Sequence, residues 1–244
     1  MIVSGFHPVL EILGKRPHSV EAVLVVKGRR DARASELEET ARAAGVVVRR
    51  VTREELDRMA GRGHNGVAAR VAARDYDPVE ACLSGEKGSR TVVFLDQVTD
   101  PGNVGSILRT AAAAGGAAVV LPERHAAGLT DAVAKASAGA LERVRVGRCG
   151  NAAQFLTEAK RLGFWVFGAD AAGENLYETD LTGDVLLCLG SEGEGLRRLT
   201  RESCDRLVSI PMEPGSGSLN VSVAAALLLY EVVRQRGGYL PARK

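Results

Sequence analysis

The first 75 residues alternate short apolar runs with amphipathic segments, a pattern typical of a small α/β unit. Continuous apolar runs indicate buried strands, whereas apolar positions spaced three or four apart indicate helices. A glycine at position 45 directly follows one helical pattern and is a common C-terminal stop. In chain order, the pattern predicts a helix over 7–13, a strand over 22–26, a helix over 34–44, a strand over 46–48, a helix over 53–60 and a strand over 66–71.

Beyond residue 90, strands and helices alternate through the rest of the chain. Near-continuous apolar strands separated by helices are typical of a mostly parallel sheet covered on both faces. A polar, glycine-containing stretch over 84–89 precedes this region, so we predict two α/β domains, at 1–75 and 91–244, joined by a linker over 76–90. The pattern in the second domain predicts strands at 91–95, 117–121, 164–169, 185–189 and 207–210, and helices near 103–114, 129–138, 151–162, 196–203 and 219–236.

Three of these strands end in small, flexible or polar residues. In open α/β sheets, ligands bind outside the carboxyl ends of the strands, and glycine lets the backbone approach a ligand closely. The glycines after residue 189 follow the order G-x-x-G-x-G, the reverse of the dinucleotide fingerprint, and the sequence contains no P-loop. A ligand site is therefore favoured, whereas a nicotinamide dehydrogenase or an NTPase is poorly supported.

Composition adds an uneven charge distribution. Residues 1–75 hold 14 Lys and Arg against 10 Asp and Glu, whereas residues 90–244 balance 17 against 17, so the N-terminal part is the better candidate for a phosphate-facing surface. The four cysteines, at 82, 149, 188 and 204, have no C-x-x-C spacing, and we expect neither a metal site nor a disulfide framework. No apolar run is long enough to cross a bilayer and the first residues do not resemble a signal peptide, so we expect a cytoplasmic protein without membrane contact.

The strand-end segments resemble, in order and spacing, three motifs of the SpoU (TrmH-like, SPOUT) RNA ribose 2′-O-methyltransferases. The segments are FLDQVTDPGNVGSILRTA (94–111), LGSEGEGL (189–196), and IPM (210–212) with SLNVSVA (218–224). The resemblance spans about 90–236 and implies an α/β SPOUT domain with a parallel sheet and a deep trefoil knot. The N-terminal segments GFHPV (5–9) and GHNGV (63–67) resemble the signatures of a small L30e-like RNA-binding domain.

The resemblance also implies the cofactor and the residues of the site. Arg109 is the residue expected at the ribose 2′-hydroxyl, Asn103 is expected to orient Arg109 or the ribose, and a carboxylate at Glu192 is expected to hold the Arg109 side chain. Helical spacing alone makes Asn103 a candidate N-cap. Asn220 could likewise cap the last helix instead of contacting ribose or phosphate. The implied catalytic set is Arg109, Asn103, Glu192, Ser218 and Asn220, and the implied S-adenosylmethionine site is the main chain around Gly190, Ile210, Leu219 and Gly195.

The last predicted helix is apolar almost all round at 223–230, so we expect it to be buried on two sides. The resemblance implies that a homodimer forms through this helix. Its implied substrate is structured RNA, with a guanosine of 23S ribosomal RNA favoured and tRNA as the alternative. A catalytically inactive RNA-binding relative is a further alternative, which the presence of every motif residue disfavours.

Overall fold

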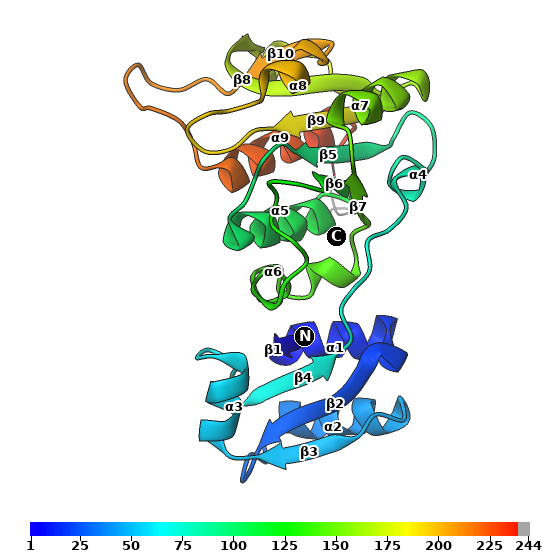
Figure 1. Cartoon of the computed structure of the whole chain (residues 1–244), viewed down its shortest axis with the longest axis vertical. Helices are drawn as coiled ribbons and strands as arrows, with labels where there is room; N and C mark the ends of the chain where they lie inside the picture. The colour runs from blue at the N-terminus through cyan, green and yellow to red at the C-terminus, as the bar shows by residue number, and fades with distance from the viewer. Residues whose placement is uncertain (239–244) are drawn as a thin grey trace, which may run out of the picture. The chain divides into compact units, whose positions relative to one another are not determined.

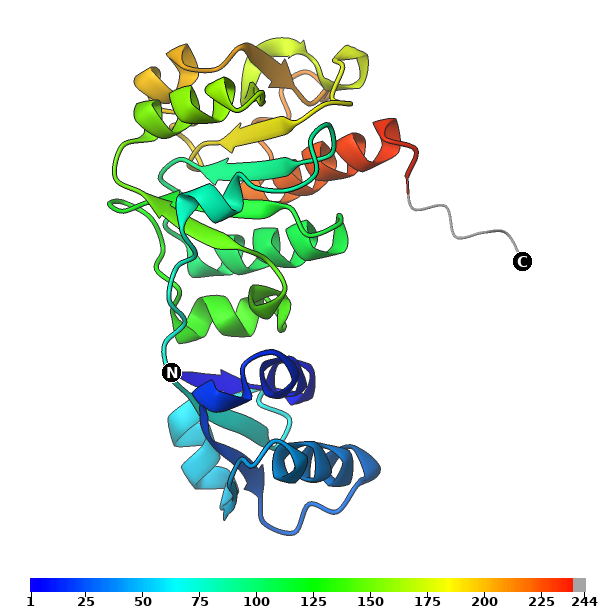
Figure 2. The ribbon, with the colours of Figure 1, turned by 90° about the vertical axis from the view of Figure 1, so that its right-hand side faces the viewer.

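The chain divides into two units in a computed structural model that describes residues 1–238 (Figures 1 and 2). Unit 1 comprises Met1–Asp75 together with Gly128–Arg143, and unit 2 comprises Tyr76–Ala127 and the chain from Val144 onward. No helix within residues 1–238 combines the length and apolar character needed to span a membrane.

Unit 1 is a four-stranded mixed sheet with helices packed against it. The strand order is β1-β4-β2-β3, in which β4 is antiparallel to both neighbours and β3 is parallel to β2. Ala22 and Leu24 on β2 pack with Leu56 and Ala68 on one face of the sheet. The strands are β1 (Ile2–Ser4), β2 (Val20–Val26), β3 (Val48–Val51) and β4 (Val67–Val71), and the helices are α1 (Phe6–Lys15), the 3₁₀ turn η1 (Pro17–Ser19), α2 (Ala32–Ala43) and α3 (Arg53–Ala60).

One predicted strand of unit 1 is misplaced. The sequence indicates a strand over 46–48, but β3 begins only at Val48. Gly45 has a φ of 71°, and the Val46 N–H donates to the Ala41 carbonyl, so these residues complete the C-terminal turn of α2. Val47 is exposed. The apolar run 46–48 therefore contains both the end of the α2 turn and the first residue of β3. Periodicity alone does not show where one ends and the other begins.

The segment Gly128–Arg143 belongs to unit 1, although its place in the sequence put it with our second predicted domain. It holds α6 (Asp131–Ala136) and the 3₁₀ turn η2 (Ala140–Glu142). Arg16 donates two hydrogen bonds to the Glu142 carboxylate, at 2.7 and 3.0 Å. The Ile2 N–H donates to Asp131 Oδ2 at 3.0 Å. These contacts join residues more than 120 positions apart, and local patterning contains no sign of them.

Unit 2 is a six-stranded, all-parallel sheet with the order β10-β8-β9-β5-β6-β7. The prediction of an α/β fold with a parallel sheet is therefore confirmed. From the central strand β5, the chain runs to β6 and β7 on one side and returns to β8 and β9 on the other, so the order reverses between β5 and β9. The strands are β5 (Thr91–Leu95), β6 (Ala118–Pro122), β7 (Val146–Cys149), β8 (Trp165–Asn175), β9 (Val185–Leu189) and β10 (Arg206–Ser209).

Helices cover both faces of this sheet (Figures 1 and 2). On one face, α4 and α7 enclose a core in which Phe155 contacts Phe94 of β5, with ring centroids 5.6 Å apart. On the other face, α5 and α9 pack against each other. The helices are α4 (Val79–Cys82), α5 (Pro101–Ala113), α7 (Ala152–Arg161), the 3₁₀ turn η3 (Leu176–Glu178), α8 (Arg198–Glu202) and α9 (Val221–Gln235).

A buried ion pair anchors the amino-terminal edge of this sheet. Arg90 Nη2 lies 2.7 Å from Asp184 Oδ2, and both side chains are nearly inaccessible. Asp184 Oδ1 accepts from the N–H groups of Gly88 and Arg90, each at 2.9 Å. Burial alone would raise the pKa of Asp184, but the hydrogen bonds from Arg90 and from the two N–H groups outweigh it. They bring the pKa down from the ordinary 3.8 to about 2. The Arg236 guanidinium donates to the carbonyls of Ser89, Arg90 and Gly183 and so fastens the end of α9 here.

We expect Asp184→Asn to lower the free energy of unfolding by roughly 3 kcal/mol at pH 7, because it leaves the buried Arg90 without its counter-charge. The folded-state pKa lies below the ordinary 3.8, so this stabilisation is complete above about pH 4 and disappears as the pH falls toward 2. Urea unfolding of the wild type and of Asp184→Asn from pH 7 to pH 2 measures the difference between their free energies of unfolding. Asp75→Asn is the control, because Asp75 is exposed and its side chain has no hydrogen bond or ion pair within residues 1–238. A difference in the free energy of unfolding that persisted at the lowest pH would contradict this account.

Candidate functional site

Three loops meet at the carboxyl edge of the unit 2 sheet, where the strand order reverses. They follow β5, β9 and β10, and they bring together three of the predicted catalytic residues: Asn103 in the first turns of α5, Glu192 in the loop after β9, and Asn220 at the start of α9. Asn103 Nδ2 donates to Glu192 Oε1 at 2.9 Å, and Asn220 Nδ2 donates to the same oxygen at 2.6 Å. Asn220 Nδ2 also lies 3.0 Å from Asn103 Oδ1. Three positions that span 117 residues therefore form one hydrogen-bonded cluster, which we call the amide–carboxylate cluster.

The position of Asn103 in this cluster depends on how α5 begins. Spacing made Asn103 a candidate N-cap, but this is wrong: the cap is Asp100, whose carboxylate accepts from the Asn103 N–H at 2.7 Å. Pro101 occupies the first helical position, where its missing N–H is tolerated. Because Asp100 caps the helix, the Asn103 side chain is available to Glu192.

Asn220 does cap its helix. Its Oδ1 accepts from the N–H and hydroxyl of Ser222, at 2.9 and 2.6 Å. An amide whose oxygen is engaged in this way presents its NH₂ group in the other direction. That group points at Glu192 and Asn103, so the start of α9 and the site are built by one side chain.

Arg109 stands apart from the cluster. The expected contact with Glu192 is not observed within residues 1–238, where Glu192 Oε1 accepts from two amides. Within residues 1–238, the exposed Arg109 side chain has no hydrogen bond or ion pair. It lies on α5 six positions after Asn103, roughly 9 Å farther along the helix axis. Its guanidinium is thus free to meet another molecule.

A cavity of about 320 Å³ lies beside the cluster, between the same loops. Every residue predicted to hold the cofactor lines it, and Ser218 does so too; the lining includes Gly190, Gly195, Ile210, Ser218 and Leu219. A Cβ on Gly190 would lie 2.0 Å from the Gly195 carbonyl carbon, so only glycine permits the loop to fold back here. Reciprocal hydrogen bonds of 3.1 and 3.0 Å between Ser191 and Gly195 close that turn.

Two further residues shape this site and were not predicted. Asp96, fully buried at the end of β5, accepts from the Arg197 N–H at 3.0 Å and from Arg197 Nε at 2.6 Å, which fastens the β9 loop to the central strand. Asp170 lines the cavity because β8 runs past its predicted end at residue 169. Between Gly168 and Glu174, β8 has no partner on β10. A polar residue directly after an apolar strand was the available signal for Asp96.

Metal chemistry has no candidate centre among residues 1–238: no three His, Cys, Asp or Glu side chains are grouped to hold an ion. The cysteines are free, and burial raises the pKa of Cys149 to about 11, well into the range of an unreactive thiol.

Comparison with known proteins assigns both parts of the chain. Residues 90–230 match the SpoU rRNA Methylase family, and residues 2–77 match the family described as RNA 2'-O ribose methyltransferase substrate binding. The 23S rRNA (guanosine-2'-O-)-methyltransferase RlmB of Xanthomonas campestris pv. campestris is 44% identical over 241 residues, which cover 97% of each chain.

Solved structures agree with this assignment. The SpoU methyltransferase AviRb from Streptomyces viridochromogenes, determined in complex with AdoMet, superposes with a TM-score of 0.81 at 29% identity and covers 97% of this chain and 90% of its own. The A. aeolicus TrmH/SpoU tRNA modifying enzyme is 30% identical, with a TM-score of 0.55, and covers 65% of this chain and 81% of its own. The chain belongs to the SpoU rRNA methylase family.

Proposed function

We propose that this chain transfers a methyl group from S-adenosylmethionine to the ribose 2′-hydroxyl of a guanosine in 23S ribosomal RNA. The observation that carries the proposal is the convergence of Asn103, Glu192 and Asn220 beside a glycine-built cavity. The relative from Xanthomonas campestris pv. campestris, named for this reaction, aligns over both units. The tRNA-modifying enzyme covers only 65% of the chain, which supports rRNA over tRNA as substrate. The proposed substrate also implies a cytoplasmic location.

The cavity suits S-adenosylmethionine in the chemistry of its lining. Gly190 and Gly195 present backbone groups without a side chain between them and a ligand, and Ile210 and Leu219 supply apolar surface. Such pockets combine an apolar lining with a few fixed polar groups. When bound, S-adenosylmethionine supplies the methyl group. The deep trefoil knot stays a prediction from the family resemblance.

Arg109, the amide–carboxylate cluster and the polar residues at the cavity rim position the RNA. A guanidinium keeps its proton at neutral pH, so we assign Arg109 the role of hydrogen-bond donor to the target phosphate or to the developing alkoxide. The amide–carboxylate cluster holds Glu192 through one oxygen, Oε1, and we assign the other, Oε2, to the ribose hydroxyl. Ser218, at the rim of the cavity, is a further ribose or phosphate contact.

A homodimer is the second part of the proposal. Val223, Leu227 and Tyr230 form one stripe on α9 and are 47%, 37% and 51% exposed, whereas Ala225, Leu228 and Val232 are buried. The expected burial of α9 on two sides is therefore not observed within a single chain. An exposed apolar stripe of this kind is typical of an interface, and a second copy of α9 would cover it and bring another chain beside Arg109.

Arg109→Ala tests the reaction. We expect methyl transfer to fall by a factor on the order of 10² to 10³, because a donor to developing charge is lost. Protein-free 23S rRNA and bulk tRNA, both from a strain lacking the gene, are incubated with tritiated S-adenosylmethionine. Arg161→Ala, which removes an exposed arginine on α7, is the control and should retain full activity. Label in tRNA alone would overturn the substrate, and label in neither RNA would favour an inactive RNA-binding relative.

Two substitutions of Asn220 test its contributions to stability and to activity separately. Asn220→Ala removes the helix cap and should lower the free energy of unfolding by about 1 kcal/mol, whereas Asn220→Ser retains a capping oxygen and should unfold like the wild type. Neither side chain carries the amide donor that holds Glu192, so we expect both variants to lose roughly tenfold or more in methyl transfer. Urea unfolding and the tritium assay give the two readouts. Full activity in Asn220→Ser would show that the cluster has no part in the reaction.

Leu227→Glu tests the dimer. A carboxylate in the centre of the apolar stripe should convert the protein to a monomer in light scattering after size exclusion and abolish methyl transfer. Leu199→Glu is the matched control, because Leu199 is 59% exposed on α8 outside the stripe. A wild-type protein that is already monomeric and active would remove the dimer from the proposal.

A further inference from the structure

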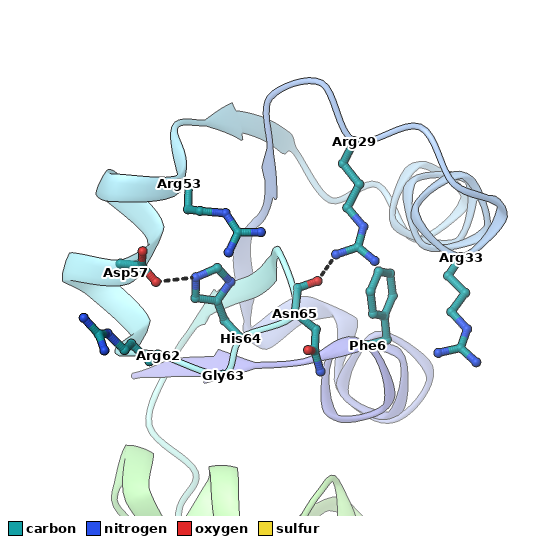
Figure 3. Close-up of a pocket in the computed structure, with 9 residues that line it drawn as sticks. All are labelled: Phe6, Arg29, Arg33, Arg53, Asp57, Arg62, Gly63, His64 and Asn65. Carbon is teal, nitrogen blue, oxygen red and sulfur yellow. Dashed lines mark hydrogen bonds and ion pairs between the residues drawn. The ribbon is translucent and has the colours of Figure 1, made fainter.

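The two N-terminal sequence signatures meet at a hollow in unit 1. Phe6, from the first signature, begins α1, and His64 and Asn65, from the second, lie in the loop between α3 and β4. Together with four arginines they line a hollow of about 620 Å³ (Figure 3). The hollow lies entirely within unit 1 and is separate from the cofactor cavity of unit 2.

The loop that forms the floor of the hollow is rigidly held. His64 is 2% exposed, and its Nδ1 accepts from the Gly66 N–H at 2.8 Å. The proton of the neutral ring therefore lies on Nε2, which donates to Asp57 Oδ1 at 2.9 Å. Gly63, Asn65 and Gly66 all have positive φ, so the loop keeps a conformation that glycine-poor sequences rarely adopt. Asp57, the one carboxylate among the lining residues, is engaged by this contact.

Arg29 forms a fixed wall. Its Nε lies 2.6 Å from Asp31 Oδ2, its Nη1 donates to the Asn65 carbonyl, and its guanidinium carbon lies 4.6 Å from the centroid of the Phe6 ring. Figure 3 shows Arg29 and Arg53 extending toward the loop that carries His64 and Asn65. Because Arg29 has an acidic partner, a loop contact and an aromatic neighbour, its role is to shape the hollow.

The other three arginines are exposed and unpaired. Within residues 1–238, the side chains of Arg33, Arg53 and Arg62 have no carboxylate partner. Arg49 and Arg58 of unit 1 also have no carboxylate partner within these residues, so what sets Arg33, Arg53 and Arg62 apart is that all three line one hollow. Three like charges around one hollow repel each other unless an anion lies between them. The hollow is thus suited to a polyanion.

We propose that Arg33, Arg53 and Arg62 bind backbone phosphates of a single-stranded RNA loop, and that the hollow is the phosphate-binding subsite of unit 1. The inference rests on the proposed function, because it names the RNA contact that positions the substrate. A hollow of this volume admits a single nucleotide, and sequence-specific RNA recognition mainly targets unpaired loops. Phosphate contacts fix the register of the RNA, while the base is chosen elsewhere.

The test compares Arg53→Ala/Arg62→Ala with Arg49→Ala/Arg58→Ala in the full chain. The control pair removes the same charge from exposed positions of unit 1 that do not line the hollow. Binding of a fluorescent oligouridine of about 12 nucleotides is measured by anisotropy between roughly 50 and 200 mM salt. We expect the hollow variant to raise Kd about tenfold and to reduce the slope of log Kd against log salt by about 1.4, or about 0.7 for each lost phosphate contact.

The methyl-transfer assay supplies a second readout. The hollow variant should raise KM for 23S rRNA and leave kcat unchanged, because phosphate positioning is lost while the chemical groups remain. Equal salt slopes and equal KM values in the hollow and control variants would overturn the inference. An unlabelled duplex of the same length should compete poorly; equal competition by the duplex would also contradict a single-strand subsite.

Failure of this inference and failure of the proposed function are distinguishable. If the wild type labels 23S rRNA and the hollow variant matches its control, the inference is wrong and the function stands. If the wild type labels no RNA, the function is wrong, and the oligouridine comparison still decides the role of the hollow. Thermal unfolding of both variants should match the wild type, because all four substituted side chains are exposed.

Discussion

The geometry of the site depends on a single carboxylate oxygen, Glu192 Oε1. It accepts from Asn103 at the start of α5 and from Asn220 at the start of α9, so it joins the loops that follow β5, β9 and β10. Each bond is exposed and individually modest in strength. Their effect is collective: Asn220 reaches Glu192 only because its oxygen caps α9, and Asn103 is free only because Asp100 caps α5. Helix capping and site assembly are therefore one arrangement.

The polar and charged groups at the two ends of the parallel strands of unit 2 differ in burial and in pairing. At the amino-terminal edge, Arg90 and Asp184 are buried, paired and surrounded by backbone partners, which fixes the strand starts and the end of α9. At the carboxyl ends of the strands, the groups of the amide–carboxylate cluster bond to one another at the surface, and the Asp96–Arg197 pair combines a buried carboxylate with a partly exposed arginine. A rigid base of this kind lets the exposed loops hold their geometry while they remain open to ligands, as expected for sites carried on loops above a fixed scaffold.

Sequence patterning predicted the strands with near-continuous apolar runs, including the edge strand β10 to within one residue, and missed the edge strand β7, which has no such run. The central strands β5 and β9 match their predicted bounds because both faces are covered. The edge strand β7, which contains Arg148, lacks a continuous apolar run and was not predicted. In the site, motif spacing identified Asn103, Glu192 and Asn220, but the pairing among them follows from helix caps that spacing does not determine. The expected Arg109–Glu192 contact is not observed within residues 1–238, where Glu192 Oε1 meets the two amides. Asp170 lines the cavity because β8 continues through a stretch that has no partner on β10.

The arginines of this chain divide by partner, and the division matches the proposed roles. Arg16, Arg90 and Arg197 each meet a carboxylate and hold segments together that are distant in sequence. Arg109 in unit 2 and the three arginines of the hollow in unit 1 have no such partner within residues 1–238. An unpaired guanidinium retains its full capacity for phosphate, since no internal ion pair must first be broken. Absence of a partner and a place at a cavity or cluster together assign RNA to both units: the unpaired arginines that line the hollow position the backbone, and the single arginine on α5 acts at the ribose.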